Sequence, residues 1–398
     1  MKNSFIKALT IAVGLFFAGS HMSFVAAETK ELKFGAIMPI SGPISFLGVA
    51  FVRGYELAID DVNKNGGLKI GNDVYKFNLV YEDSKLSPEG AAQAARKLVY
   101  KDDIKYIFGA ILSVSAAAIS DVTEQAGVMH LISWIDEPLH PGDISPKKRL
   151  VVRPTISADA PYEMDYDYLK KNYPQAKRVV LVVDQGYEGM RARAKKVAEE
   201  RGFIVVGQVE WPFGIEDFIP VYTKVMSYKP DAVHIMISGQ AGQQVKAARQ
   251  LGFRGPIFSD TPGDPYTSLI EQAGEEFCYD VFSNGIDIKA VTPAMKKVIK
   301  AWDDKYHEQF VSDAFTAYDS AWILFQAMDK VQSVDPNEVI KAFDLMTAEN
   351  SIDTLFGPGK IAGKERFGVN RVLVRPIPIT KLDNEEQTFI GFFDQVSP

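Results

Sequence analysis

The chain contains 398 residues, of which 46% are hydrophobic and 24% are charged, and its formal net charge is −7 at pH 7. This length is too great for one typical core and predicts two domains. The negative balance, with no basic cluster, excludes nucleic acid as an expected partner, and a single cysteine excludes an internal disulfide.

The first 27 residues have the three-part pattern of a cleaved secretion signal. Two lysines precede an apolar run over residues 8–18, and small residues at 25–27 end the segment. This run is shorter than the roughly 20 residues of a membrane-spanning helix, which disfavours a membrane anchor. We therefore expect cleavage after Ala27, with Ala26 as the alternative, and a soluble periplasmic protein. Its net charge becomes −9, because the signal contains two lysines and no acidic residue.

The following chain alternates predicted strands with predicted helices. In the first set, strands are predicted over 32–38, 77–81, 104–108, 128–132 and 150–153, and helices over 46–63, 88–100 and 114–126. In the second set, strands are predicted over 178–183, 203–210 and 232–237, and helices over 188–201, 218–227 and 240–251. Three further helices are predicted over 293–306, 315–330 and 336–347. This alternation is typical of an α/β fold with parallel strands and helices on both faces.

The opening segment carries a more specific pattern. Its strand is broken by Pro39, Gly42 and Pro43, a helical pattern follows, and the helix ends at Gly66 and Gly67. No Gly-x-Gly-x-x-Gly occurs in this loop, which disfavours a dinucleotide-binding enzyme. The pattern resembles the start of the type I periplasmic solute-binding proteins, the leucine/isoleucine/valine-binding family of ABC importers.

The resemblance implies a fold and a mode of action. It implies two doubly wound parallel-sheet lobes joined by a three-crossover hinge, with lobe I at 31–153 plus 285–355 and lobe II at 154–284 plus 356–398. It further implies a monomer that captures a small ligand between the lobes and delivers it to the membrane permease of an ABC importer. Two alternatives stay open, a ligand sensor of a signalling system with the same fold and, more remotely, an exported hydrolase.

The segment after the predicted strand 104–108 is the strongest candidate ligand site. Ser113 or Ser115 is placed to cap the next helix, and the free N–H groups of a helix's first turn form a seat for an anion. The resemblance implies that Ser113 binds a ligand carboxylate together with the N–H groups of Val114 and Ser115. Ordinary helix capping is the alternative role of these serines.

Other positions are implied by the resemblance to line the same cleft. These are Phe46 and Leu47 as a roof, Ile135 and Asp136 after the next strand, Tyr187 and Ile237 with Ser238 in the second lobe, and Asp260 or Thr261 near a ligand amine. The chain departs from the family where Trp134 replaces a proline and where Ile237 and Ser238 replace an aromatic residue. A hydrophobic or aromatic carboxylate therefore competes with a branched-chain amino acid as the expected ligand.

Enzyme signatures are weak. The five histidines show no metal-binding spacing, and no Gly-x-Ser-x-Gly motif occurs. His130 and His234 lie inside predicted strands, where hydrogen-bonded structural histidines are expected. We therefore expect no enzymatic activity, no metal and no cofactor.

Overall fold

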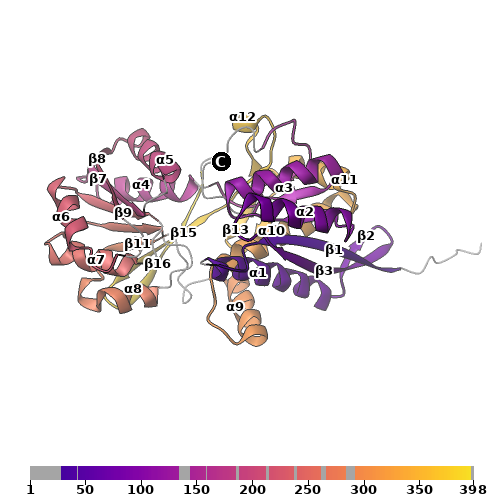
Figure 1. The fold of residues 1–398 in the computed structure, drawn as a ribbon, viewed down its shortest axis with the longest axis horizontal. Helices are drawn as coiled ribbons and strands as arrows, with labels where there is room; N and C mark the ends of the chain where they lie inside the picture. Colours follow the sequence, from indigo (N-terminus) through magenta and orange to yellow (C-terminus); the bar gives the residue numbers. More distant parts are fainter. Residues whose placement is uncertain are drawn as a thin grey trace, which may run out of the picture.

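The computed structural model describes residues 28–395 except 43, 134–143, 158, 185–187, 212–214, 237–239, 261–265 and 284–291. Within these residues, two sheets form the centres of two lobes, which Figure 1 shows beside one another. We call the lobe that contains strand β1 (Thr29–Met38) lobe I, and the lobe that contains strand β7 (Arg178–Asp184) lobe II.

The sheet of lobe I has the strand order β2-β3-β1-β4-β5-β6. Besides β1, its strands are β2 (Leu68–Ile70), β3 (Asp73–Asp83), β4 (Tyr106–Phe108), β5 (Met129–Leu131) and β6 (Val151–Val152). All neighbours pair in parallel except β2, which pairs antiparallel with β3. The predicted parallel sheet is confirmed, with an antiparallel edge strand added.

The sheet of lobe II has the strand order β16-β15-β11-β10-β9-β7-β8. Besides β7, its strands are β8 (Ile204–Trp211), β9 (Ala232–Met236), β10 (Ile257–Asp260), β11 (Val281–Ser283), β15 (Ile377–Asp383) and β16 (Glu386–Phe393). The strands from β8 to β11 are parallel, while β15 and β16 form an antiparallel edge. The parallel parts of both sheets thus share one winding order.

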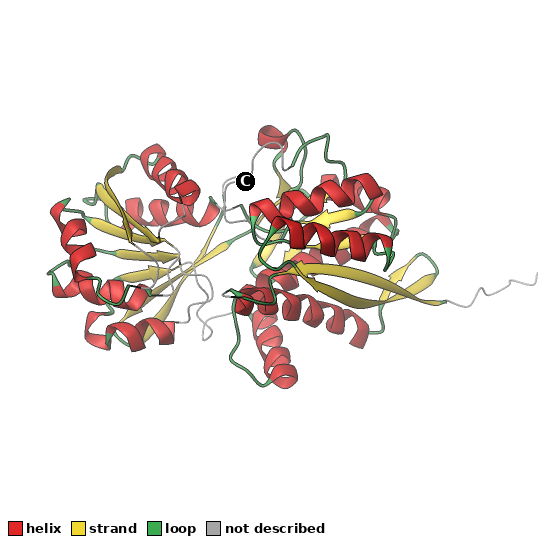
Figure 2. Ribbon diagram, viewed as in Figure 1, coloured by secondary structure: helices red, strands yellow, loops and turns green. Residues whose placement is uncertain are grey.

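Helices cover both faces of the sheets, as Figure 2 shows for lobe I. They are α1 (Ser45–Lys64), α2 (Pro88–Tyr100), α3 (Ser113–Ala126), α4 (Ala160–Asn172), α5 (Glu188–Glu200), α6 (Ile219–Ser227), α7 (Ala241–Gln250), α8 (Tyr266–Ala273), α9 (Pro293–Tyr306), α10 (Asp313–Val331), α11 (Pro336–Leu345) and α12 (Lys364–Phe367), with a 3-10 turn at Glu275–Phe277. Side chains alternate across β1, so Ile37 packs in the cluster with α2 and α3, while Ala36 and Met38 pack with α1 and α10.

A third sheet of β12 (Ile352–Thr354), β13 (Gly357–Ala362) and β14 (Val372–Val374) adjoins lobe I. Arg153, which follows β6, forms a parallel bridge to Val372. The chain therefore passes into the sheet of lobe II between β14 and β15. The resemblance places this crossing earlier, at residue 356.

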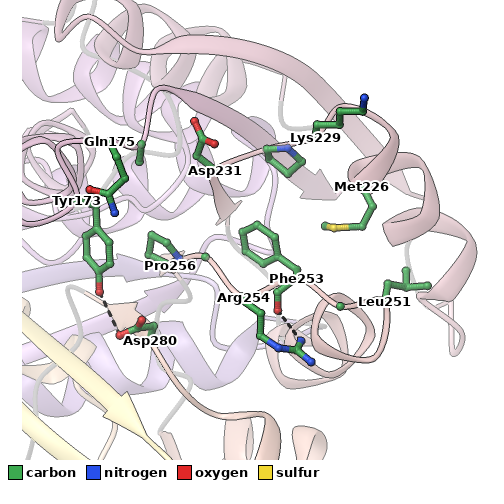
Figure 3. Close-up of a pocket in the computed structure, with 14 residues that line it drawn as sticks. Tyr173, Gln175, Met226, Lys229, Asp231, Leu251, Phe253, Arg254, Pro256 and Asp280 are labelled. Carbon is green, nitrogen blue, oxygen red and sulfur yellow. Dashed lines mark hydrogen bonds between the residues drawn. The ribbon is translucent and has the colours of Figure 1, made fainter.

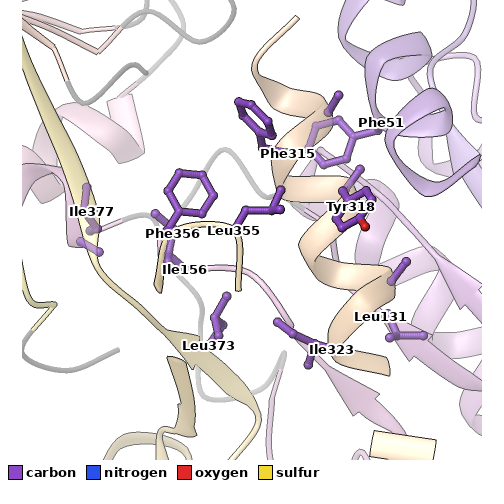
Figure 4. Packing of buried hydrophobic residues seen from close by; sticks show 14 of the residues in the cluster. Phe51, Leu131, Ile156, Phe315, Tyr318, Ile323, Leu355, Phe356, Leu373 and Ile377 are labelled. Carbon is purple, nitrogen blue, oxygen red and sulfur yellow. The ribbon is translucent and has the colours of Figure 1, made fainter. Parts of the chain in front are cut away.

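Apolar side chains pack continuously where the chain passes between the lobes. Ile156 on the first crossing, Leu373 and Ile377 around the third, and Phe356 beside them belong to one buried cluster, parts of which Figure 4 shows. This cluster extends into both lobes, to Phe34 in lobe I and Phe282 in lobe II, for example. The first and third crossings are therefore part of a packed core.

Ion pairs of two buried carboxylates accompany this packing. Asp159, just before α4, pairs with Arg193 of α5 and, at 3.1 Å, with Arg366 of α12. Arg375 lies 3.8 Å from Asp319 of α10. Removing one member of such a pair leaves an uncompensated buried charge, so these residues fix the path of the crossings.

The two histidines in strands are buried and hydrogen-bonded, as the sequence predicts. The Nδ1 atom of His130 in β5 lies 2.8 Å from the hydroxyl of Ser120, and its Nε2 atom lies 2.5 Å from the carbonyl oxygen of Gly109. The Nδ1 atom of His234 in β9 lies 2.9 Å from the hydroxyl of Tyr166. Burial lowers the pKa of His130 to about 4, against the opposing hydrogen bond to the Gly109 carbonyl.

The single cysteine, Cys278, is buried, and burial raises the pKa of its thiol to about 11. It therefore behaves as the small buried hydrophobe expected from the sequence. Among the residues that the structure describes, no helix combines the length and the apolar character needed to cross a membrane.

Helices α1 and α10 approach each other closely at Gly54. A Cβ atom at this position would lie 2.4 Å from the carbonyl oxygen of Ala314 and 2.7 Å from the Cβ atom of Ala317. The backbones of the two helices therefore pack at a distance that only glycine allows, although glycine is a poor helix former.

We predict that Gly54→Ala destabilises the protein by about 2 kcal/mol, because overpacking outweighs the gain in helix propensity. Gly127→Ala is the control, since a Cβ atom there meets nothing within 4 Å and only its φ of 68° opposes alanine. It should cost about 1 kcal/mol. Denaturant unfolding measures both, and a Gly54→Ala variant as stable as the wild type would contradict the prediction.

We predict a pH-dependent difference in stability between the wild type and His130→Gln. As the pH falls, the unfolded chain binds a proton at His130 near pH 6.5, before the folded protein does near pH 4. The wild type should therefore lose about 2 kcal/mol relative to His130→Gln between pH 7 and pH 5. Other buried groups cancel in this difference, and parallel pH profiles of the two proteins would refute it.

Candidate functional site

In both sheets, the strand order indicates where a ligand is expected to bind. Open parallel sheets bind ligands outside the carboxyl ends of their strands, where the strand order reverses. In lobe I the reversal lies between β1 and β4, and in lobe II between β7 and β9. The carboxyl ends of both sheets are directed toward the opposite lobe (Figure 2). The loops after these four strands are therefore the candidate site.

The loop after β1 is held by a carboxylate at the end of β3. Asp83 accepts hydrogen bonds from the hydroxyl of Ser41 at 2.5 Å and from the backbone N–H groups of Ile40 and Lys85 at 3.2 and 2.8 Å. Burial opposes ionisation, but these hydrogen bonds outweigh it and lower the pKa of Asp83. The loop thus enters α1 along a fixed path.

The first turn of α1 carries two of the sequence-predicted site residues. Phe46 is 52% exposed, and Leu47 is half-buried against the core of lobe I. Exposure of a large aromatic side chain costs free energy that a bound apolar group would recover. Phe46 is therefore available for contact with a ligand, while Leu47 mainly supports the turn.

Helix α3 begins at Ser113, directly after the loop that follows β4. Its N-cap residue is Leu112, in an extended conformation, and no side chain caps the helix. The prediction that Ser113 or Ser115 caps α3 is therefore wrong. The reason is register, because Ser113 is the first helical residue and Ser115 lies inside the first turn, where a hydroxyl does not occupy the capping position.

The start of α3 has the chemistry of an anion site. The first hydrogen bond of the helix runs from the N–H group of Ala116 to the carbonyl of Leu112, so the preceding N–H groups have no acceptor within the helix. No acidic residue lies in the first turn, so the helix itself supplies no negative charge at the positive end of its dipole. Val114 is 59% exposed, whereas Ser115 is 1% exposed and its hydroxyl has no hydrogen-bond partner among the described residues.

The backbone before α3 is fixed from two sides. A Cβ atom on Gly109 would lie 2.5 Å from the carbonyl oxygen of Ile37 in β1, so only glycine fits at this point. Its N–H group donates to the carbonyl of Leu131 at 3.0 Å, and its own carbonyl is within hydrogen-bond distance of His130. The path from β4 to α3 is thus determined by the strands on either side of it.

Two polar side chains that sequence patterning missed lie beneath the same edge of lobe I. The hydroxyl of Tyr55 in α1 lies 2.5 Å from that of Ser133, just after β5, and both residues are buried. The Tyr55 ring also stacks on Phe108 at the end of β4, with 4.4 Å between ring centroids. In the sequence, Tyr55 counts only as an apolar position of the helix. The feature that could have indicated this contact is its hydroxyl group, which needs a hydrogen-bond partner when it is buried.

The remaining predicted site residues are not all described by the structure. Outside the described residues lie Ile135, Asp136, Tyr187, Ile237, Ser238 and Thr261, as does Trp134. Asp260 ends β10 at the carboxyl edge of lobe II, and only its backbone is described. The structure thus describes five of the predicted residues with their side chains: Phe46, Leu47, Ser113, Val114 and Ser115. They lie on the first turns of α1 and α3, which follow neighbouring strands at one edge of the sheet.

A pocket of about 590 Å³ lies elsewhere in lobe II (Figure 3). Asp231, Pro256 and Asp280, which line it, precede β9, β10 and β11 respectively. It therefore lies at the amino ends of the strands, away from the predicted site. Within the described part of the chain, no group of three or more side chains is arranged to hold a metal ion.

Known proteins share this architecture. The Leu/Ile/Val-binding protein of Escherichia coli is 27% identical over 353 residues, which cover 86% of this chain and 91% of that protein. A branched-chain amino acid transporter substrate binding protein from Streptococcus pneumoniae, solved with isoleucine, aligns with a TM-score of 0.70 and 21% identity over 90% of this chain and 99% of that one. A solute binding protein of an ABC transporter from R. palustris, solved with benzoate, aligns with a TM-score of 0.70 and 19% identity over 92% and 98%.

A family model also matches the sequence of this chain directly. Residues 31–387 match the family described as periplasmic binding protein, which is most of the chain. The two sheets of like winding order and the crossings between them agree with the type I form of that fold. This chain belongs to the periplasmic binding protein family.

Proposed function

We propose that this protein is an exported, non-enzymatic receptor that binds a small carboxylate between its lobes and delivers it to the permease of an ABC importer. One observation carries the proposal. The exposed side chains of Phe46 and Val114 lie on the first turns of the two helices that flank the strand-order reversal, beside the uncapped start of α3. This edge therefore offers an apolar contact and an anion seat together.

The chemistry of this edge indicates the class of ligand. The N–H groups of Val114 and Ser115 and the hydroxyl of Ser113 are proposed to bind the carboxylate. The apolar part of the ligand would contact Phe46 and the Val114 side chain. The relatives solved with isoleucine and with benzoate both hold a carboxylate attached to an apolar group, which supports this class.

The two-lobed architecture supports a clamp mechanism. A ligand that contacts both lobes favours the closed arrangement, because only that arrangement provides all of its contacts. Tyr187, Ile135, Asp136, Ile237, Ser238 and either Asp260 or Thr261 are proposed to complete the site. The periplasm is the proposed location, since the family acts there and residues 1–27 have the pattern of a secretion signal.

We predict saturable binding of isoleucine, benzoate or both to the mature protein, with the ligand recovered unchanged. A ligand present at 100 times its Kd should stabilise the fold by about 2.7 kcal/mol, which raises the thermal midpoint. Calorimetry gives the affinity, and chromatography of the recovered ligand tests for turnover. Conversion of the ligand would contradict a receptor role.

We predict that Ser113→Ala weakens carboxylate binding about 10-fold, the usual effect of removing one hydrogen bond to a charged group. Denaturant unfolding of the same variant separates a loss of affinity from a loss of stability. Unchanged affinity measured by calorimetry would remove Ser113 from the proposed site.

We predict opposite effects of Val114→Asp on helix stability and on binding. An aspartate in the first turn of α3 should stabilise the helix by about 0.5 kcal/mol through the dipole. It should weaken carboxylate binding at least about 10-fold by charge repulsion. Val114→Asn is the uncharged control of the same shape, and equal affinities of the two variants would place the carboxylate elsewhere.

A further inference from the structure

One buried side chain connects the core of lobe I to the start of α3. The ring of His130 lies between Ser120 on α3 and the carbonyl group of Gly109 in the loop before α3. A carbonyl oxygen only accepts hydrogen bonds, so the Nε2 atom carries the proton and its N–H group donates a hydrogen bond to the Gly109 carbonyl. In the neutral ring the Nδ1 atom then accepts from the Ser120 hydroxyl.

The hydrogen bond from His130 acts on a residue, Gly109, whose backbone is held from two sides. Gly109 is packed against the Ile37 carbonyl on one side, and its N–H group is bound to Leu131 on the other. Its carbonyl is the remaining backbone group, and His130 determines its direction. Ser113 follows only four residues later, which places this peptide group directly before the first turn of α3.

We propose that His130 is a positioning residue that, through the Gly109 carbonyl, orients the first-turn N–H groups of α3 and thereby favours a carboxylate over a neutral amide. The inference rests on the proposed function for its ligand, while the positioning itself concerns the ligand-free protein. Binding groups need support of this kind, since a displacement of about 1 Å is enough to weaken a site.

Three substitutions distinguish the hydrogen bond at Nε2 from the hydrogen bond at Nδ1. In His130→Gln the side-chain amide nitrogen lies as many bonds from the backbone as the Nε2 atom does, so it can still donate to Gly109. In His130→Asn the amide lies at the level of the Nδ1 atom and reaches only the Ser120 side. Ser120→Ala removes the partner of Nδ1 and leaves the donation to Gly109 in place.

The first arm measures amide hydrogen exchange in the ligand-free protein. The reporters are the N–H groups of Gly109 and Ala116, which donate to the carbonyls of Leu131 and Leu112. We expect His130→Asn to speed their exchange about 10-fold, and His130→Gln and Ser120→Ala to stay within about 3-fold of the wild type. Equal exchange in His130→Asn and His130→Gln would overturn the positioning role.

The second arm measures affinity for benzoate and for its neutral analogue benzamide. His130→Asn should weaken benzoate about 10-fold and benzamide less than about 3-fold, whereas His130→Gln should keep the wild-type ratio. The matched control is His234→Asn, which alters an equally buried histidine of lobe II and should leave the ratio unchanged. An unchanged ratio in His130→Asn would overturn the inference.

The two arms distinguish the inference from the function on which it rests. If the wild type bound no carboxylate, the proposed function would fail for these probes and so would the selectivity role, while the exchange arm would still decide the positioning role. If the wild type bound benzoate and His130→Asn bound it equally well, the proposed function would stand and the inference would fall.

Discussion

The parallel order of the strands is the constraint on which the rest of this molecule depends. Parallel strands end at the same edge of a sheet, so residues distant in sequence meet there. In lobe I this edge brings together the loop after β1, the start of α3 and Ser133 after β5. Lobe II has the same order in its parallel strands, so each lobe presents one such edge.

The edge of lobe I combines a rigid base with an exposed surface. Asp83 holds the loop after β1, Tyr55 binds Ser133, and Gly109 is fixed by its neighbours. Beside these contacts, the side chains of Phe46 and Val114 are exposed to solvent. A fold in which polar contacts order the loops, while apolar side chains beside them stay exposed, is suited to binding.

Much of this architecture is predictable from local sequence, because several helices carry complete start signals. Helices α2 and α9 begin and end at the predicted residues. Each starts with a proline after a capping residue, Ser87 and Thr292 respectively, whose side chain accepts a backbone N–H. Helix α4 has Asp159 at its N-cap and a proline in its first turn, but the Asp159 side chain makes no capping hydrogen bond. Its buried residues also include Asp165 and tyrosines, which obscures the apolar face in the sequence. Strand β15 depends on a partner that local patterning does not reveal, because it pairs with β11, about 100 residues away.

The candidate site was predictable only in its position. The end of β4 and the start of α3 lie where the sequence places them, to within two residues. The cap was not predictable, because a shift of one residue decides whether a serine caps a helix or begins it. The sequence predicts a hydrogen-bonded His130 but not its partners, and it treats Tyr55 only as a core position, because the contacts of both residues join separate elements.

The central claim is that a carboxylate ligand draws the two lobes together around it. Small-angle X-ray scattering of the mature protein, alone and with a saturating carboxylate that calorimetry shows to bind, tests this claim most directly. The account predicts a smaller radius of gyration in the bound protein, because lobe closure removes the space between the facing sheet edges. Superimposable scattering profiles under saturation would contradict it.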